Sequence, residues 1–258
     1  MPPAASAIPT KRTLLFDAPV HVAVPVVGRV ESFPVRRVYC VGRNYEDHAR
    51  EMGFTGREPP FFFMKPADAL LVVNQGAVGA MPYPALTSNL HHEIELVVAL
   101  GKGGRDIKAA DAMALVFGYA VGLDMTRRDL QNQMKKEGRP WEIGKAFEHS
   151  GPIGPITRKE VVPDISTAAI ALAVNGSVRQ KGSISQLIWN IAETIEHLSA
   201  AWELRPGDLI FTGTPEGVGP VTPKDLLVGT IEGLAELRVR IEPATPLEVQ
   251  QQAGADKT

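Results

Sequence analysis

The sequence predicts a strand-rich α+β protein, and two observations carry this prediction. The 24 glycines and 21 prolines are spread through the 258 residues without a period, which is typical of a chain with many turns. The apolar runs between these turns are mostly short, as strands are, and few stretches have helical periodicity. Because 44% of the residues are hydrophobic, the chain can bury a sizeable core.

Charge and cysteine content argue against several classes of protein. The net charge of −2 gives no reason to expect a nucleic acid or an anionic membrane as a partner. Cys40 is the only cysteine, so no intramolecular disulfide can form, and its apolar neighbours indicate a buried structural thiol. We find no signal-peptide pattern at the N-terminus and no apolar window near the length of about 18 residues that spans a membrane. We therefore expect a soluble, cytoplasmic protein.

Apolar runs bounded by glycine, proline or asparagine predict the strands. We expect short strands within residues 13–30 and longer ones over 38–41, 61–64, 91–100, 115–123, 170–174, 178–180 and 234–241. The Asn175-Gly176 pair between two of these runs is the strongest hairpin signal in the chain.

Helical spacing and end signals predict the helices. We expect them over residues 43–53, 109–113, 126–137 and 185–203. Thr126 and Asp129 match a capping box, with Asp in place of the usual Glu, and Gly138 would end that helix.

The strand expected over residues 91–100 carries the clearest chemical signal. Alternation places Glu93 and Glu95 on one face, about 7 Å apart, and Ile94 and Leu96 on the other. Two carboxylates on one face repel each other unless a positive charge lies between them, and a divalent cation with oxygen ligands would supply it. The alternative is a strand end at which both glutamates simply face water.

Other polar residues follow buried runs and are candidates for the same site. Asp124 ends a long apolar run, where its charge is costly unless it is paired or bound to a metal. Arg128 and Gln131 lie three apart on the next helix, so both can face Asp124. Lys145 stands among small and apolar residues, which suits a partner for developing negative charge.

The remaining candidates have a plain structural alternative. His48 and Glu51 share a helix face, so the pair is either a general base with its orienting carboxylate or a surface salt bridge. Lys65 either binds an anionic substrate group or only reaches the surface. The glycine-rich stretch around Thr214 exposes backbone N–H groups that can bind a carboxylate or an oxyanion.

Several ordered motifs together resemble the fumarylacetoacetate hydrolase family, over roughly residues 37–242. They are Tyr39–Tyr45, His91–Glu95, Leu123–Gln131, Lys145–Phe147 and Phe211–Gly219. The resemblance implies a mixed β-sandwich roll with a few flanking helices, in which residues 37–242 form the catalytic domain. Residues 1–36 would then be a small N-terminal strand region, and residues 243–258 an expected disordered tail.

The resemblance also implies roles for single residues. Mg²⁺ or Mn²⁺ would be held by Glu93, Glu95 and Asp124, with His91 as a neighbour and not a ligand. His48 with Glu51 would be the base on a lid helix, and Lys145 would stabilise the oxyanion. The substrate-binding groups implied are Arg43, Lys65, Arg128, Gln131 and Thr214.

Within the family, the chain looks like the short branch that cleaves acylpyruvates. The expected reaction is hydrolysis of a C–C bond in fumarylpyruvate, in the breakdown of gentisate. We expect a homodimer that binds a small oxo-acid substrate and neither nucleic acid nor a membrane. Two alternatives remain. The chain could decarboxylate or isomerise a related oxo-acid, or it could be an acylpyruvase that acts on acetylpyruvate or oxaloacetate. A non-catalytic metal-binding protein and a phosphate-binding protein are further alternatives, although neither glycine loop has phosphate-loop spacing.

Overall fold

Two β-sheets form the centre of the protein, whose computed structural model describes residues 14–15, 17–45 and 57–244. The larger, eight-stranded sheet follows the order β4 (Phe61–Lys65), β3 (Val38–Gly42), β15 (Leu209–Phe211), β8 (Ile94–Leu100), β9 (Val116–Leu123), β11 (Gly151–Ile153) and β5 (Leu70–Val72), and β12 (Thr157–Arg158) pairs with β9 beside this path. Strand β15 runs parallel to β3 and antiparallel to β8, so the sheet is mixed.

The second sheet has five strands and contains the predicted hairpin. Its order is β14 (Ser177–Ser183), β13 (Ala169–Val174), β17 (Leu226–Ile231), β18 (Leu237–Glu242) and β6 (Gly79–Pro82). Asn175 and Gly176 connect β13 to β14, and both have left-handed φ angles, of 51° and 80°. Since a two-residue turn of this kind matches the twist of paired strands, the hairpin prediction is confirmed.

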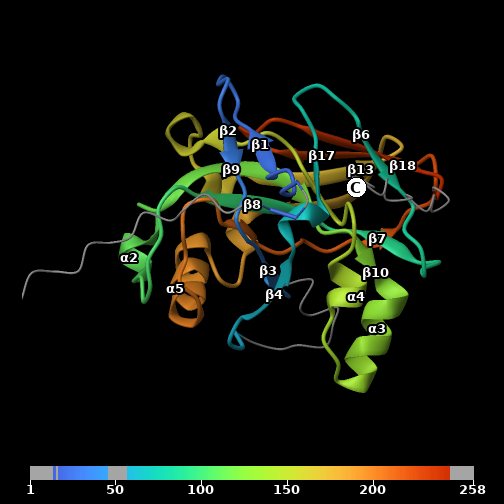
Figure 1. The fold of residues 1–258 in the computed structure, drawn as a ribbon, viewed down its shortest axis with the longest axis horizontal. Coiled ribbons are helices and arrows are strands. Elements are labelled where there is room, and N and C mark those ends of the chain that lie inside the picture. Colours follow the sequence, from blue (N-terminus) through green and yellow to red (C-terminus); the bar gives the residue numbers. More distant parts are fainter. Residues whose placement is uncertain (1–13, 16, 46–56, 245–258) are drawn as a thin grey trace, which may run out of the picture.

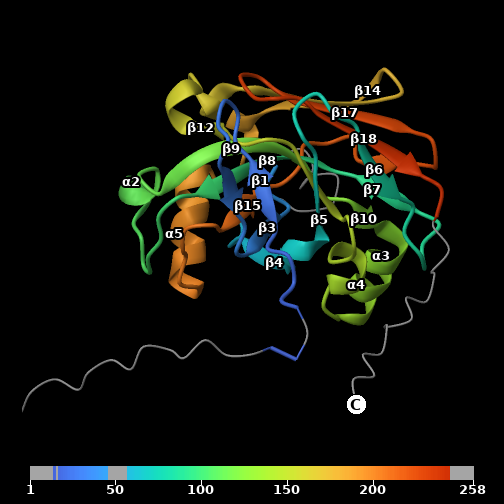
Figure 2. The ribbon, with the colours of Figure 1, turned by 45° about the horizontal axis from the view of Figure 1, so that its top comes forward.

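The two sheets pack face to face, and the main sheet is covered on its other face as well. Figure 2 shows β17 and β18 as a layer over β8 and β9. A Cβ at Gly229 of β17 would lie 3.1 Å from side chains of both Ile94 and Val121, so the layers are in close contact there. The small strands β1 (Ala23–Pro25) and β2 (Ser32–Pro34) cover the opposite face, where Val24 packs in one core cluster with Val97. Strand β8 is consequently buried along its whole length.

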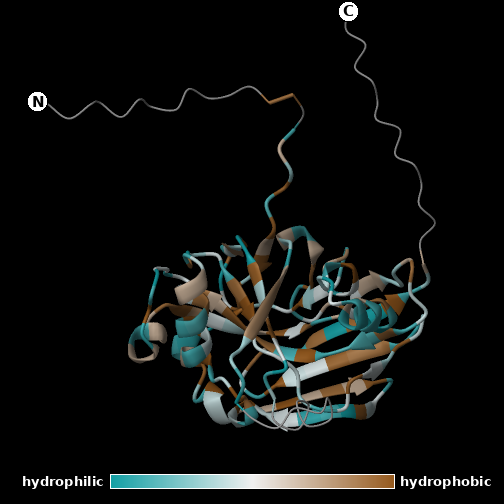
Figure 3. Cartoon of the chain, turned by 90° about the horizontal axis from the view of Figure 1, so that it is seen from below, coloured by the Kyte–Doolittle hydropathy of each residue, from teal (hydrophilic) through white to brown (hydrophobic). Residues whose placement is uncertain are grey.

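The helices lie at the ends of this sandwich. Figure 1 shows α3 (Arg128–Glu137) and α4 (Glu142–Lys145) at one end, away from α2 (Ala109–Ala112) and α5 (Ile191–Ala201). Short 3₁₀ turns occur at Ala67–Ala69, Lys159–Val161, Ile165–Thr167 and Ile184–Gln186. In Figure 3 hydrophobic and hydrophilic residues are interspersed along the strands. No helix of the described residues is long and apolar enough to cross a membrane.

The strand-rich α+β fold is confirmed, but two helix predictions are wrong in detail. The helix expected over residues 185–203 begins only after Asn190, whose side chain caps Glu193 N–H, because Asn44 holds the preceding Ile188 and Trp189 through hydrogen bonds. The capping box at Thr126 does not form.

Thr126 belongs instead to the short strand β10 (Thr126–Arg127), and Asp129 accepts hydrogen bonds from Thr87 and Ser88. Most of the helix expected over 43–53 and most of the tail after residue 243 lie outside the described residues.

Candidate metal and active site

The strand expected over residues 91–100 is broken at Glu93. Residues before the break form β7 (Leu90–His92), which pairs with β10 and β16 (Gly219–Pro220) in a separate three-stranded sheet, and β8 starts at Ile94. The buried side chain of Gln180 explains the break. Its Oε1 lies 2.9 Å from His92 Nδ1 and accepts a hydrogen bond of 3.1 Å from Ile94 N–H, so it contacts both neighbours of Glu93.

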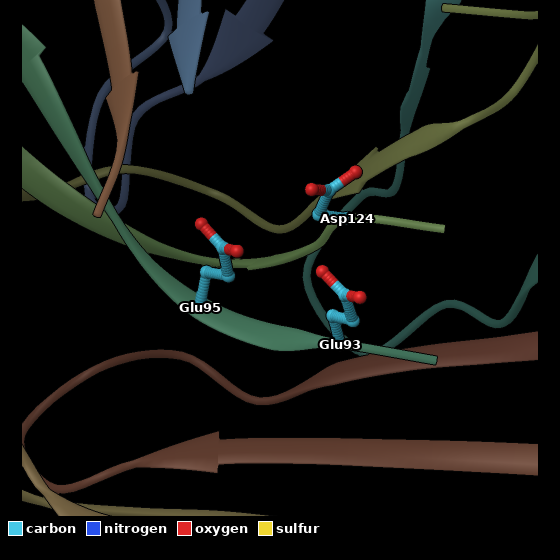
Figure 4. A group of neighbouring side chains, drawn as sticks. All are labelled: Glu93, Glu95 and Asp124. Carbon is cyan, nitrogen blue, oxygen red and sulfur yellow. The ribbon is translucent and has the colours of Figure 1, made fainter. Parts of the chain in front are cut away.

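Glu93, Glu95 and Asp124 nevertheless converge as a group, which we call the carboxylate triad. Figure 4 shows Glu93, which precedes β8, Glu95 of β8 and Asp124, which follows β9, pointing into the same space. One oxygen atom of each residue lies within 4.8 Å of those of the other two. Each of the three residues is at most 5% exposed to solvent. The sequence prediction that these three acids meet is therefore fulfilled by the geometry.

Buried cations surround the triad. The ammonium of Lys145 donates to Glu93 Oε2 at 2.7 Å and to Asp124 Oδ2 at 2.6 Å. Burial alone would lower the pKa of Lys145, but Asp124 and Glu93 outweigh it and raise the pKa above its usual value. The guanidinium of Arg128 forms a further ion pair with Glu93. Lys145 is consequently charged and is held against two of the three carboxylates.

Glu95 differs from the other two acids because its partner is a backbone group. Its Oε2 accepts a hydrogen bond of 2.8 Å from Gly213 N–H. Gly213 has a left-handed φ of 101°, and a Cβ there would lie 2.8 Å from that of Asn44, so only glycine fits this position. Burial, followed by the charges of Asp124 and Glu93, raises the pKa of Glu95 well above its usual 4.5.

These observations fit a divalent cation. The donors are all carboxylate oxygens, which suit Mg²⁺ or Mn²⁺ better than Zn²⁺. Asp124 Oδ1 is buried and accepts no hydrogen bond from the described residues, although Lys65 Nζ lies 2.9 Å from it. Burial and the charges of Asp124 and Glu93 disfavour the ionised form of Glu95, and a bound cation would favour it. We therefore treat the triad as a metal-binding site.

A cavity opens beside the triad and contains most of the predicted substrate-binding residues. Its lining includes Arg43, Arg128, Gln131 and Thr214, together with Lys145. Arg128 also donates a hydrogen bond to Gln131 Oε1, which fixes the two side chains relative to each other. Their roles toward a substrate stay predictions, but four of the five are brought together.

Lys65 is the exception among these five. Its side chain is fully buried behind Asp124, and its ammonium contacts Asp124 Oδ1 and the backbone carbonyl of Lys145. Lys65 does not line the cavity beside the triad. The prediction that it binds a substrate carboxylate is therefore wrong, because its ammonium is paired with Asp124. The expectation that Lys65 simply reaches the surface does not fit either.

The histidines divide into two cases. His48 and Glu51 lie outside the described residues, so the predicted base pair stays a prediction. His91 stands beside the triad without belonging to it, and its Nε2 lies 2.9 Å from Asn89 Oδ1. Burial and the charge of Arg128 lower the pKa of His91 to about 4. A histidine that remains neutral suits the neighbour role expected from the sequence.

Two residues of the site were not found by sequence reasoning. Thr126 Oγ1 accepts a hydrogen bond of 2.7 Å from Lys145 Nζ, which completes three acceptors for that ammonium. Gln180 Nε2 donates to Thr214 Oγ1 at 2.8 Å and to the Pro215 carbonyl at 2.9 Å. Thr126 lies within the motif after Asp124 and was within reach of prediction, whereas no local signal marks Gln180.

Comparison with known proteins identifies a matching family and several similar enzymes. A model of the family described as fumarylacetoacetate (FAA) hydrolase C-terminal matches residues 37–242. The crystal structure of fumarylpyruvate hydrolase from Pseudomonas aeruginosa, in complex with Mn²⁺ and pyruvate, is 56% identical, with a TM-score of 0.88 over 90% of this chain and 100% of that chain.

Two curated relatives carry different activities in their names. Fumarylpyruvate hydrolase of a Ralstonia species is 46% identical over 187 residues, which is 72% of this chain and 95% of the relative. The mitochondrial oxaloacetate tautomerase of Bos taurus is 42% identical over 207 residues, which is 80% of this chain and 92% of the relative. The similarity thus spans nearly the whole length of proteins that act on different substrates.

Proposed function

The chain belongs to the fumarylacetoacetate hydrolase family, and from this membership we propose that it hydrolyses a carbon–carbon bond of an acylpyruvate. The proposed substrate is fumarylpyruvate, and the products are fumarate and pyruvate. The observation that carries the proposal is the buried carboxylate triad with Lys145 and Arg128 at its side, opening into a cavity. The Mn²⁺ and pyruvate held by the 56% identical Pseudomonas aeruginosa enzyme support the same assignment.

The triad would hold Mg²⁺ or Mn²⁺ through its oxygens. Such a cation supplies Lewis-acid chemistry, because it draws negative charge onto the oxo-acid end of the substrate. Arg128 and Gln131 face the cavity beside the triad and can donate to that end as well. Arg128 also forms an ion pair with Glu93. In our proposal it therefore compensates the charge of this acid and donates hydrogen bonds to the substrate.

Water must add to the carbonyl carbon of the acyl group. In our proposal His48, oriented by Glu51, removes a proton from the water molecule while the water oxygen bonds to that carbon. The bond from this carbon to the methylene of the pyruvyl group then breaks, and the methylene carbon takes a proton to give pyruvate. The new C–O bond leaves fumarate as the second product.

We assign to Lys145 the stabilisation of the oxyanion of the tetrahedral intermediate. One such donor contributes about 3 kcal/mol to transition-state stabilisation. The ammonium has three protons, and Glu93, Asp124 and Thr126 accept from it. Donation to substrate therefore requires that one of these three acceptors be given up. The hydroxyl of Thr126 is neutral and is the least costly of them to lose.

A second candidate is the enolisation or decarboxylation of oxaloacetate. The 42% identical bovine oxaloacetate tautomerase supports it, since its similarity also covers 80% of this chain. Neither reaction needs a water nucleophile, so neither needs a base that activates water. The expected homodimer, the cytoplasmic location and the choice between Mg²⁺ and Mn²⁺ stay predictions.

Turnover of fumarylpyruvate, acetylpyruvate and oxaloacetate, measured side by side with Mg²⁺, tests the proposal. We expect fumarylpyruvate to have the highest kcat/KM and to yield fumarate and pyruvate in equal amounts. Turnover of oxaloacetate alone would replace the proposal with the second candidate. Turnover of none of the three would contradict an acylpyruvate enzyme.

A further inference from the structure

The face of α3 that carries Arg128 and Gln131 continues outward to Lys135. Positions three and four apart on a helix lie on the same face, so Lys135 stands one turn beyond Gln131. The helix starts beside β10 and runs away from the sandwich (Figure 1). Arg128 and Gln131 line the cavity next to the triad. Lys135 therefore stands further from the triad along the same face.

Trp141 forms an aromatic wall at this outer end. Its ring lines the cavity and packs edge to face against Phe61, with centroids 5.2 Å apart. Lys135 Nζ lies 5.9 Å from the centroid of the Trp141 ring, and Arg43 Cζ lies 6.0 Å from the same centroid. Both distances are within the range of cation–π attraction. Two cations from different elements thus gather at one wall.

Arg43 reaches this position from an unusual backbone conformation. It follows β3 with a φ of 56°, in the left-handed region that is unfavourable for a non-glycine residue. Its guanidinium also lies over the Phe61 ring, with Cζ 5.3 Å from the centroid. Burial lowers the pKa of Arg43, with the charge of Glu58 acting in the opposite direction. The conformation is therefore kept despite a cost.

The charge of Lys135 is not fully compensated by the residues that the structure describes. Burial and then the charges of Arg43 and Arg128 lower the pKa of Lys135, and Glu93 only partly offsets them. Among the residues that the structure describes, no carboxylate forms an ion pair with Lys135. An ammonium without a carboxylate partner among the described residues, beside a ring that lines the cavity, favours an anionic ligand there.

We propose that Lys135, together with Arg43, binds a carboxylate at the acyl end of the substrate. The triad end takes the oxo-acid group, and these two cations take the second carboxylate of an extended dicarboxylate such as fumarylpyruvate. Lys135 would then set the preference for a charged acyl group over a neutral one such as acetyl. This inference rests on the proposed function and adds the residue that selects the substrate class.

The variant that tests it is Lys135→Met, which keeps an unbranched apolar chain against Trp141 and removes the charge. Its matched control is Lys136→Met, an exposed lysine on the same helix. We expect Lys135→Met to lower kcat/KM for fumarylpyruvate about tenfold, mainly through KM, as a partly exposed charged contact would. Acetylpyruvate should change less than twofold, and Lys135→Arg should restore most of the fumarylpyruvate activity.

Binding measured by calorimetry separates this inference from the proposed function. Crotonate has a methyl group where fumarate has its second carboxylate. The binding of either compound can be measured without turnover. Fumarate should bind the wild type more tightly than crotonate, and Lys135→Met should abolish most of that difference.

Equal losses on fumarylpyruvate and acetylpyruvate, or an unchanged preference for fumarate over crotonate, would overturn the role of Lys135. Failure of the wild type to cleave any acylpyruvate would overturn the proposed function instead, while the fumarate comparison would still decide the role of Lys135.

Discussion

The ammonium of Lys145 lies 2.6 Å from Oδ2 of Asp124, deep inside the protein. It bridges this aspartate, which follows β9, to Glu93, which precedes β8. The third acid, Glu95, depends on the backbone N–H of Gly213 instead. The three carboxylates therefore have different partners, and replacing each partner should have a different effect.

Lys145→Met should destabilise the protein as well as inactivate it. The substitution leaves Glu93 and Asp124 facing each other without their shared buried cation, and breaking a buried ion pair costs about 3–5 kcal/mol. We expect the free energy of unfolding in denaturant to fall by about this amount without metal, and by less with Mn²⁺. Activity should fall on the order of 100-fold.

The control is Lys102→Met, since Lys102 is exposed and follows β8 at the end opposite to Glu95. It should unfold like the wild type. Unchanged stability and unchanged activity in Lys145→Met would mean that the lysine is not part of the working site.

Glu95→Gln should remove most of the affinity for a divalent cation. The amide oxygen of glutamine can still accept from Gly213 N–H, so the fold should be preserved while the charge is lost. Loss of one ligand charge should weaken Mn²⁺ binding on the order of 100-fold, as measured by calorimetry. A matched substitution of an exposed acid, Glu236→Gln, should leave the affinity unchanged.

The pH dependence of metal-free stability should reveal the same glutamate. Its pKa is raised in the folded protein, so the folded state holds this proton more tightly than the unfolded state does. The stabilisation is present at pH values below the ordinary glutamate pKa of 4.5 and is lost as the pH rises through the raised value. Thermal unfolding without metal should show a decrease in Tm over this interval.

Glu95→Gln should make that dependence flatter, because it removes the titrating group. Mg²⁺ should raise the Tm of the wild type more at high pH than at low pH, since protons compete with the cation for this carboxylate. A Tm that rises through the same interval in the metal-free wild type would contradict the assignment.

Gln180→Met should destabilise the protein through groups that lose their partners. Gln180 serves Ile94 N–H, the Pro215 carbonyl and the hydroxyl of Thr214, all of them buried contacts. Leaving such groups unsatisfied costs about 1–3 kcal/mol each, so we expect a loss of about 3 kcal/mol in denaturant unfolding. Gln133→Met, on an exposed face of α3, should cost less than about 0.5 kcal/mol.

His48→Gln tests the residue that sequence resemblance alone assigns as the base. The variant should lose hydrolysis of fumarylpyruvate by about 100-fold or more and keep the Mn²⁺ affinity of the wild type. Glu51→Gln should have a smaller effect of the same kind. If both variants remained fully active on fumarylpyruvate, water would be activated by another group.

The sequence was sufficient where a feature depends on neighbours along the chain. The apolar runs located β3, β4, β8 and β9, and the Asn175-Gly176 pair located its hairpin. Strand alternation singled out Glu93 and Glu95, and the end of an apolar run singled out Asp124, whereas the family resemblance implied that the three acids form one site. In the same way, the glycine at 138 correctly marked the end of α3.

Features that depend on distant side chains were not predictable. Gln180 breaks the strand at Glu93 from far along the chain, and Asn44 delays the start of α5 by holding Ile188. The same holds for Lys65, which contacts Asp124 although β4 and β9 are not neighbours in the sheet, so no local pattern marks this contact.

The most direct test of the account is turnover of fumarylpyruvate by protein stripped of metal with EDTA and then titrated with Mn²⁺. We predict no release of fumarate and pyruvate from the stripped protein and full recovery at one Mn²⁺ per chain in the wild type. Glu95→Gln should not recover under the same titration. Undiminished turnover after stripping, or recovery by Glu95→Gln equal to that of the wild type, would contradict a catalytic cation on the carboxylate triad.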